Sequence, residues 1–366
     1  MDSQEKKRIV VAMSGGVDSS VACALLAKAG HEVIGITLRL WTPSVWNNND
    51  KFGSCCSPRE VSTAKKVCQD LNVPHYTYNM EKAFMEKVVD NFVSEYVNGR
   101  TPNPCVQCNR FIKFDPLFKY ALALNADYLA TGHYARIEKN ADNLEFYLAK
   151  AKDLTKDQSY FLYMLGPSQL SRLLFPVGDF SKPEIRQMAE KFNLINAQKE
   201  DSQDVCFLEG RSYREFLKER VNENLMPKGP IVTRAGKVLG EHSGLANYTI
   251  GQRGGLGVAA GEPIYVIEKR TETNTLVVGA ETENLKTNCK LHTVTWCSGN
   301  PPGQAVRAQV KVRYRHPGVW TTIYPAEKGL TALEFDEPQT SITPGQSAVF
   351  YDGSRVLGGG VIGNIS

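Results

Sequence analysis

The feature of this chain that most constrains its fold is the glycine- and serine-rich segment SGGVDSS, residues 14–20. It follows an apolar run typical of a buried strand, residues 8–13, and precedes an apolar run typical of a helix, residues 21–28. A glycine-rich turn between a strand and a helix presents backbone N–H groups and the positive helix terminus, which together bind phosphate. The sequence therefore predicts a phosphate-binding loop at the end of a strand in an α/β domain.

Two details of this loop indicate the kind of nucleotide site. The pattern GxxxxGK[ST] is absent, and with it the lysine that contacts the β- and γ-phosphates in Walker A loops. SGGxDSS instead resembles the PP-loop of the ATP pyrophosphatase superfamily, whose members cleave ATP between the α- and β-phosphates to adenylate a substrate. The resemblance implies ATP with Mg²⁺, and Asp18 either holds that ion or fixes the loop. The competing interpretation is a serine-rich turn that only caps a helix.

Composition limits the class of protein only broadly. The chain has 366 residues and a net charge of +4, which suits two or three domains and permits, without requiring, an acidic polymer as partner. Residues 1–7 are hydrophilic, and no apolar run approaches the length of a membrane span, so we expect a soluble, cytoplasmic protein without a membrane partner. Nine cysteines, an odd number, argue against a disulfide framework. Buried packing is expected of Cys23, Cys68, Cys289 and Cys297.

Strands and helices alternate through the first half of the chain, which predicts a doubly wound parallel sheet. Ligands of such sheets bind beyond the carboxyl ends of the strands, where Leu38, Gly132 and His133 are also expected. A β-hairpin is predicted over residues 135–149, and short strands with turns such as Pro344-Gly345 predict a C-terminal β-barrel. The expected α/β architecture is a PP-loop catalytic domain (1–212), a small central domain (213–281) and a β-barrel (282–366).

A second informative segment is TPNPCVQCN, residues 101–109, which contains the CxxC pair Cys105 and Cys108. Its prolines and asparagines predict a stiff, exposed loop without regular structure. A thiol beside cations has a lowered pKa and becomes nucleophilic. Cations near this pair in the sequence are Arg100, Arg110 and Lys113.

Three chemistries compete for this CxxC pair. A structural zinc site needs a second pair at comparable spacing, but Cys55 and Cys56 are adjacent and Cys206 stands alone. A thioredoxin-type redox pair would lie between a strand and a helix start, and would leave the phosphate loop without a purpose. A catalytic sulfur-transfer loop accounts best for both segments.

Cys206 lies among carboxylates in the segment EDSQDVCF, residues 200–207. Their negative charge disfavours a thiolate at this position. Cys206 is therefore either activated by another group or works as a persulfide, whose terminal sulfur is more acidic and more nucleophilic than a thiol. The competing interpretation is a partly buried cysteine between a loop and a helix.

Together these segments resemble the MnmA-type tRNA-specific 2-thiouridylases, and the resemblance runs nearly from end to end. The matching pieces occur in order: AMSGGVDSS, TPNPCVQCN, ATGHYA, KDLTKDQSYFL, DSQDVCF, HSGLANYTIGQRGGLG and KVRYRH. The resemblance implies ATP-dependent thiolation at C2 of the wobble uridine in certain transfer RNAs. It also implies a protein that donates the sulfur, such as a cysteine desulfurase or a relay protein.

The chemistry of this reaction explains why both segments share one chain. The C2 oxygen of uracil is a poor leaving group, and transfer of AMP to it makes the carbon electrophilic and the oxygen a good leaving group. By position in the motifs, Cys206 corresponds to the persulfide carrier of the family and Cys108 to its nucleophile. The terminal persulfide sulfur attacks C2, the second thiol releases it, and the two cysteines end as a disulfide.

The resemblance also assigns contact residues. The target base is contacted by Asn103, Pro104 and Cys105, and ATP by Ala12, Met13, Ser14, Gly15, Gly16, Val17, Asp18, Ser19, Leu38 and Gly132. Contacts to the rest of the tRNA are assigned to His133, Lys156, Asp157, Gln158, Arg313, Tyr314 and Gln346. In KVRYRH, residues 311–316, alternation predicts a strand with its cations on one face and Val312, Tyr314 and His316 on the other. Arginine and tyrosine can contact phosphate and stack on a base. An ordinary solvated strand face is the alternative.

One position departs from the family pattern. Many members carry aspartate, thought to be a general acid or base, at the position of Cys105. A proton-transfer role for Cys105 is therefore in doubt, and Cys105, Cys108 and Cys206 could instead hold three corners of a [4Fe–4S] cluster.

Two other functions would account for only some of these motifs. A PP-loop ligase or synthetase would adenylate a small molecule, which leaves Cys108 and Cys206 without a role. A non-catalytic RNA-binding or sulfur-carrier protein would need a degenerate phosphate loop, whereas SGGVDSS is complete.

Overall fold

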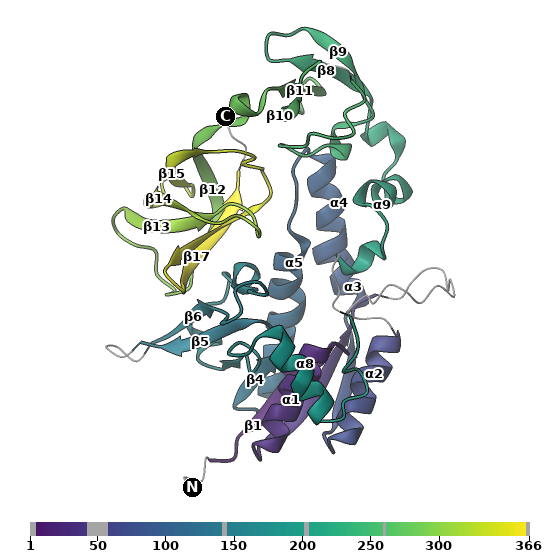
Figure 1. Cartoon of the computed structure of the whole chain (residues 1–366), viewed down its shortest axis with the longest axis vertical. Helices are drawn as coiled ribbons and strands as arrows, with labels where there is room; N and C mark the ends of the chain where they lie inside the picture. Colours follow the sequence, from purple (N-terminus) through teal and green to yellow (C-terminus); the bar gives the residue numbers. More distant parts are fainter. Residues whose placement is uncertain (1–4, 42–57, 141–144, 201–204, 259–260, 364–366) are drawn as a thin grey trace.

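The computed structural model describes residues 5–41, 58–140, 145–200, 205–258 and 261–363. The chain is elongated, with an α/β unit at one end, a small β unit at the other, and a β-barrel beside the helical segment that joins them (Figure 1).

The α/β unit is built on a five-stranded sheet in the order β3-β2-β1-β4-β7. Neighbouring strands of this sheet all pair in parallel, which confirms the predicted parallel sheet. The order reverses at β1, so the loop after β1 lies at the switch point where such sheets bind ligands. The strands are β1 (Arg8–Ala12), β2 (Glu32–Arg39), β3 (His75–Asn79), β4 (Tyr128–Thr131) and β7 (Leu173–Leu174).

Two groups of helices cover the two faces of this sheet, because neighbouring strand residues point to opposite sides. Ile9 and Val11 pack with α1 (Val17–Lys28), α2 (Pro58–Asp70) and α8 (Lys182–Lys191). On the other face Val10 packs with the helical segments 81–97 and 104–123. These comprise α3 (Glu81–Phe84), the π-helical η1 (Met85–Val89), α4 (Asp90–Val97), α5 (Pro104–Gln107), the π-helical η2 (Cys108–Phe114) and α6 (Asp115–Ala123).

The CxxC pair lies in this helical segment, so the predicted irregular loop is wrong for residues 104–109. Asn103 is the N-cap, and its side-chain oxygen accepts a hydrogen bond from the N–H of Val106 at 3.3 Å. Pro104 occupies the first helical position, where a missing N–H removes no hydrogen bond. Asparagine and proline start a helix here, whereas the sequence predicted that they would prevent one.

The central unit follows α9 (Tyr213–Arg220) and holds a four-stranded sheet in the order β10-β11-β8-β9. Its core contains Ile231, Val266, Leu276 and Val278. Its strands are β8 (Gly229–Thr233), β9 (Val238–His242), β10 (Tyr265–Arg270) and β11 (Thr275–Gly279).

The C-terminal strands form a closed β-barrel, as predicted, because β12 pairs with both β15 and β17. The strands are β12 (Lys286–Trp296), β13 (Val306–Lys311), β14 (Val319–Ile323), β15 (Thr331–Gln339), β16 (Ser347–Asp352) and β17 (Arg355–Ile362). The predicted hairpin is also present, as β5 (Ala135–Lys139) and β6 (Phe146–Lys150), and Ala149 on β6 pairs with Arg355 on β17. The hairpin of the α/β unit and the barrel strands therefore belong to one continuous sheet.

The predicted strand over KVRYRH is only partly correct. Strand β13 ends at Lys311, and the following residues form a bend and a turn. The alternation of exposure nevertheless persists, since Arg313 and Arg315 are exposed while Val312 and His316 are buried. Burial of the apolar and histidine side chains, rather than strand pairing, sets this pattern.

Short helical segments complete the described chain: η3 (Ser159–Phe161), α7 (Pro167–Leu170), η4 (Cys206–Leu208), η5 (Glu223–Leu225), η6 (Leu245–Asn247) and η7 (Glu281–Asn284). Within the described ranges, none of the helices is both long and apolar enough to span a membrane.

Candidate nucleotide and thiol site

A pocket of about 200 Å³ opens at the carboxyl ends of β1, β2 and β4, where the sheet order reverses. Its lining contains most of the predicted ATP contacts: Ala12, Met13, Ser14, Gly16, Asp18, Ser19, Leu38 and Gly132. Sequence reasoning did not assign the other lining residues Ile36, Leu40, Lys113, Leu117 and Thr131 to ATP. Apolar side chains beside a loop of N–H and hydroxyl donors suit a ligand with a flat ring and an anionic chain.

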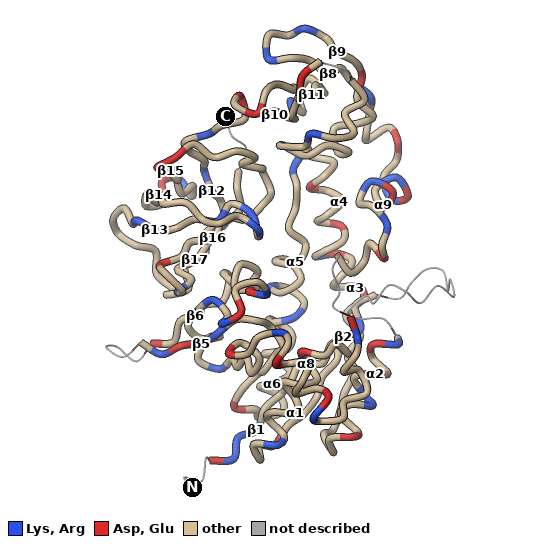
Figure 2. Tube along the Cα trace, viewed as in Figure 1, with Lys and Arg blue, Asp and Glu red and all other residues tan. Residues whose placement is uncertain are grey.

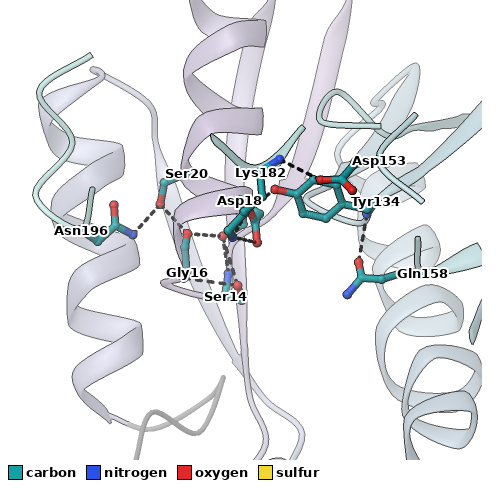
Figure 3. A network of polar contacts seen from close by, with 10 residues as sticks. Ser14, Gly16, Asp18, Ser20, Tyr134, Asp153, Gln158, Lys182 and Asn196 are labelled. Atoms are coloured by element: carbon teal, nitrogen blue, oxygen red, sulfur yellow. Dashed lines mark hydrogen bonds and ion pairs between the residues drawn. The ribbon is translucent and has the colours of Figure 1, made fainter. Parts of the chain in front are cut away.

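Hydrogen bonds between the serines of the loop and Gly16 fix the conformation of the loop (Figure 3). The Ser19 and Ser20 hydroxyls donate to the carbonyl oxygen of Gly16 at 3.1 and 3.0 Å, and the N–H of Ser14 donates to Ser19 Oγ at 3.2 Å. The end of β4 approaches closely, since a Cβ added at Gly132 would lie 2.5 Å from the Ser19 nitrogen. Glycine is therefore required at 132 for the strand end and the loop to meet.

Gly15 and Val17, two predicted ATP contacts, lie outside the pocket lining. Val17, the first residue of α1, is 4 % exposed and packs in the hydrophobic core. Gly15 has φ of +74°, and a Cβ there would lie 2.5 Å from the carbonyl oxygen of Glu60. The glycine lets the loop pass close to α2.

Asp18 is held by two side chains from other elements. Lys182 Nζ lies 2.7 and 3.0 Å from the two carboxylate oxygens, and the Tyr134 hydroxyl donates to Oδ1 at 2.7 Å. Lys182 is 7 % exposed, and its ammonium also lies over the Tyr134 ring, 5.7 Å from the ring centroid. Of the two predicted roles for Asp18, these contacts support fixing the loop.

Lys182 is a site residue that sequence reasoning missed. It occupies the first helical position of α8, after Ser181 and before Pro183. A cation at a helix N-terminus is opposed by the helix dipole. That local conflict was the available signal that this lysine has a partner elsewhere.

A second set of contacts fixes the outer side of the loop. The Asn196 amide donates to the carbonyl oxygen of Gly15 and to Ser20 Oγ, both at 3.0 Å. Lys199 forms an ion pair with the buried Glu60, whose backbone faces Gly15. Residues well beyond the loop in sequence therefore define its shape.

Two predicted tRNA contacts, His133 and Gln158, line the nucleotide pocket. His133 Nδ1 lies 2.8 Å from Thr131 Oγ1, and its ring stacks on Phe114 at 5.8 Å between centroids. Gln158 accepts a hydrogen bond from the N–H of Tyr134 at 2.9 Å. Their place in the lining adds polar groups to the pocket beside the phosphate loop.

Asp157, also a predicted tRNA contact, is 5 % exposed. Its carboxylate accepts from the N–H groups of Ala151 and Ser159 at 3.0 and 3.2 Å, and from the Ser159 hydroxyl at 2.9 Å. These bonds commit the side chain to organising its own turn. The neighbouring Lys156 is half-buried.

The three cysteines of the predicted site differ in exposure. Cys105 is exposed, Cys108 is 7 % exposed, and Cys206 is half-buried at the start of η4. Cys108 belongs to the main hydrophobic cluster and Cys206 packs against the same cluster. In this structure the two are not joined by a disulfide.

The three cysteines do not form a ligand set for an iron–sulfur cluster in this conformation. Across the described residues, no three histidine, cysteine, aspartate or glutamate side chains are grouped to hold a metal ion. A cubane cluster with three protein ligands needs three thiolates around one site. The arrangement therefore does not fit the cluster.

The remaining described cysteines are core residues, as predicted. Cys23, Cys68, Cys289 and Cys297 are buried. Burial raises the pKa of Cys289 and of Cys297 to about 12, and a hydrogen bond with Cys68 together with burial raises that of Cys23. These thiols stay protonated near neutral pH and are poor nucleophiles.

The predicted tRNA contacts of the barrel lie on the side that faces the catalytic unit. Tyr314 is half-buried, with its ring 4.7 Å from that of Phe161. Arg313 is exposed and donates to the carbonyl oxygen of Thr340 at 3.4 Å. The side-chain amide of Gln346 donates to the carbonyl oxygens of Thr101 and Pro102 at 3.0 and 3.1 Å. Gln346 therefore contacts the segment that precedes the CxxC helix.

These features define an α/β nucleotide-binding unit of PP-loop type joined to two β domains, with a cysteine pair on the helix beside the nucleotide pocket. Families match all three units. Residues 7–210 match the tRNA methyl transferase HUP domain, residues 214–280 the tRNA methyl transferase PRC-barrel domain, and residues 286–362 the Aminomethyltransferase beta-barrel domain.

Relatives match over nearly the whole chain. The tRNA-specific 2-thiouridylase MnmA of Carboxydothermus hydrogenoformans is 44% identical over 362 residues, which cover 99% of each chain. That of Geobacter metallireducens is 46% identical over 364 residues, covering 99% of this chain and 98% of the relative. The solved complex of a 4-thiouridine synthetase with RNA and ATP is more distant, at 16% identity and a TM-score of 0.34 over 59% of this chain and 50% of that one. The chain belongs to the tRNA-specific 2-thiouridylase family.

Proposed function

We propose that this chain is an ATP-dependent tRNA sulfurtransferase that makes 2-thiouridine at the wobble position of the anticodon. One observation carries the proposal: a single helical segment bears Cys105 and Cys108 at its start and contributes Lys113 and Leu117 to the nucleotide pocket. Cys108 and Lys113 are between one and two helical turns apart. A base held between them can meet an adenylating centre and a thiol without leaving the site.

In the proposed reaction, the C2 oxygen of uridine attacks the α-phosphate of ATP and pyrophosphate leaves. The loop N–H groups and hydroxyls bind the phosphates, and Gly16 and Ser19 lie in the pocket lining to do so. Mg²⁺ bound with ATP would offset charge on the phosphates, and Asp18 is the carboxylate in the pocket lining.

The sulfur-transfer step uses Cys108 and Cys206. The terminal sulfur of a Cys206 persulfide attacks C2, which forms a C–S bond and expels AMP from the same carbon. The Cys108 thiolate then attacks the Cys206 sulfur, which releases the thiolated base and leaves a disulfide. Both cysteines lie against one hydrophobic cluster, but bond formation requires them to come within about 2 Å, so this region moves during turnover.

A macromolecular substrate requires contacts beyond the pocket. We assign the target base to Asn103, Pro104 and Cys105, and the rest of the tRNA to His133, Lys156, Gln158, Arg313 and Tyr314. Figure 2 shows lysines and arginines interspersed with acidic residues along the whole trace, so the grip relies on local sets of cations. A cysteine desulfurase or a relay protein supplies the persulfide sulfur, and a reductant of the thiol class must reopen the disulfide.

We also propose domain limits at residues 1–212, 213–281 and 282–366. The family matches at 7–210, 214–280 and 286–362 support these limits. The first limit falls directly before α9, and the second falls within η7, after its first residue.

Two family descriptions name methyl transfer, which makes a methylated base the competing product. The test incubates the full chain with ATP, a persulfide donor and tRNA that has an unmodified wobble uridine, and then measures nucleoside masses. Sulfur for oxygen at C2 raises the mass by about 16 Da and releases one pyrophosphate per base. A methylated nucleoside, or pyrophosphate release that depends on a small molecule and not on tRNA, would overturn the proposal.

A further inference from the structure

A tight turn of the barrel, residues 343–347, reaches the start of the CxxC helix; we call it the barrel clasp. The N–H of Gln346 donates to the carbonyl oxygen of Thr343 at 3.1 Å, with Pro344 and Gly345 between them. Gly345 has φ of +91°, and proline followed by a glycine of positive φ is the pattern of a type II turn. The clasp therefore has a rigid shape that its own sequence specifies.

Three hydrogen bonds join this clasp to the segment before the CxxC helix. The N–H of Thr101 donates to the carbonyl oxygen of Pro344 at 2.8 Å. The Gln346 side-chain amide donates to the carbonyl oxygens of Thr101 and Pro102 at 3.0 and 3.1 Å. An amide NH₂ has two hydrogens, so both are committed to this segment.

The carbonyl oxygens of this segment have two kinds of partner. Those of Asn103 and Pro104 accept from N–H groups of the helix that follows, whereas those of Thr101 and Pro102 accept from Gln346 of the barrel. The approach is close as well, since a Cβ added at Gly345 would lie 2.8 Å from the Thr101 carbonyl oxygen. A glycine at 345 is thus required by both the turn and the contact.

The same clasp is connected to the cap of the CxxC helix. Tyr160 is 1 % exposed, and its hydroxyl donates to the carbonyl oxygen of Ser347 at 2.8 Å and interacts with the nearby Asn103 side chain. Asn103 caps the helix through the N–H of Val106. A chain of contacts therefore runs from the barrel through Tyr160 and Asn103 to the helix that carries Cys105 and Cys108.

We infer that Gln346 is a positioning residue, through which the barrel clasp sets the placement of the CxxC helix start. This inference rests on the proposed function only for its effect on thiolation; the placement of Cys105 is a property of the protein alone. It differs from the tRNA contact that resemblance assigns to Gln346, because both amide hydrogens already bind the protein. Docking of the barrel thereby couples to the geometry of the thiols.

The test compares Gln346→Leu, which keeps the side-chain size and removes the donors, with Gln304→Leu, an exposed glutamine elsewhere in the barrel. In the full chain without RNA, the alkylation rate of Cys105 by iodoacetamide is measured between pH 6 and 9 by mass spectrometry. We expect Gln346→Leu to change the rate at least threefold and Gln304→Leu to leave it unchanged. The affinity for tRNA should stay within twofold while the kcat of thiolation falls.

A second variant changes another residue of the barrel clasp. Gly345→Ala should displace Thr101 and reproduce the change in Cys105 alkylation. Gly329→Ala is its control, because Gly329 also has positive φ, +79°, but an added Cβ meets nothing within 4 Å. This pair keeps the test decisive if Gln346→Leu fails to fold, which thermal melting shows.

The outcomes separate the two proposals. Unchanged Cys105 alkylation in both Gln346→Leu and Gly345→Ala, with weakened tRNA binding, would overturn the positioning role and make Gln346 an RNA contact. Altered Cys105 alkylation in these variants, together with a wild-type chain that forms no 2-thiouridine, would instead overturn the proposed function and keep the positioning role.

Discussion

Lys182 Nζ contacts both carboxylate oxygens of Asp18, at 2.7 and 3.0 Å, across a distance of 164 positions in the sequence. The lysine is 7 % exposed and sits at the start of α8, while Asp18 lies in the phosphate loop after β1. A buried ammonium without its carboxylate partner is strongly destabilising. The pair therefore joins the shape of the loop to the stability of the α/β unit.

Asp18→Ala should abolish adenylation and also destabilise the chain. Removal of the carboxylate leaves Lys182 buried without its anionic partner and the Tyr134 hydroxyl without its acceptor, which we expect to cost about 2 kcal/mol or more. Pyrophosphate release and the thermal midpoint measure the two effects. Asp70→Ala is the matched control, because Asp70 forms an exposed helix pair with Lys66. Normal pyrophosphate release by Asp18→Ala would show that the loop does not need this residue.

Cys108→Ser and Cys206→Ser should each abolish thiolation while tRNA-dependent pyrophosphate release continues, because the adenylation step uses neither thiol. Nucleoside mass analysis and pyrophosphate release measure the two steps. The core variants Cys23→Ser and Cys68→Ser should keep the reaction and lose stability, since a buried hydroxyl without a full set of partners costs about 1–3 kcal/mol. Wild-type thiolation by Cys206→Ser would exclude the persulfide mechanism.

The affinity for tRNA should fall as the salt concentration rises, because each neutralised phosphate releases counterions. On a duplex such as B-form DNA, the logarithm of the binding constant falls with the logarithm of the salt concentration with a slope of about −0.9 per phosphate contact. Arg313→Glu, at an exposed position of the turn after β13, should weaken binding and flatten that slope. Filter binding between 50 and 200 mM salt, a range of about fourfold, measures both effects. An affinity that does not depend on salt would show that these cations do not hold the RNA.

The barrel should lose stability as the pH falls below the ordinary pKa of histidine, and His316 should contribute to the loss. Burial lowers the pKa of His316, and Arg313 and Lys311 lower it further, while Gln339 opposes the shift. A histidine whose pKa is lowered by folding is neutral in the folded chain and takes up a proton on unfolding. Its stabilisation is therefore complete above about pH 6.5 and declines as the pH falls below that value.

His316→Gln removes the titrating group and should flatten this pH dependence. Urea unfolding of the full chain at pH 7.5 and pH 5.5, followed by tryptophan fluorescence, gives the comparison; we expect the variant to lose less stability between the two pH values than the wild type does. Equal losses in both proteins would assign the pH dependence to other groups, such as His75 and His242, whose pKa values burial also lowers.

Much of the fold could be predicted because its signals are local. Alternating strands and helices predicted the parallel sheet, and Gly15 and Gly16 between a strand and a helix predicted the loop at its switch point. Pro344-Gly345 predicted a turn, and the structure has one at that position. In each case neighbours in the sequence determine the backbone conformation.

Local signals also misled where one residue type has two uses. The sequence predicts that Asn103 and Pro104 prevent regular structure, whereas in the structure they cap and start the CxxC helix. Asparagine and proline favour turns and helix starts alike, and the choice depends on whether the following residues can pack. Here Val106 and Cys108 are buried in the main hydrophobic cluster, which favours the helix.

The sequence by itself therefore determined the order of the units and the phosphate loop, and it singled out the cysteines that we propose as reactive, because short motifs specify them. Only the tertiary structure decided which distant residues support them: Lys182 for Asp18, Asn196 for Gly15, and Gln346 for the start of the CxxC helix. These pairs join residues separated by 164, 181 and 245 positions. No periodicity or spacing encodes such contacts, since packing of the sheet, helices and barrel brings the partners together.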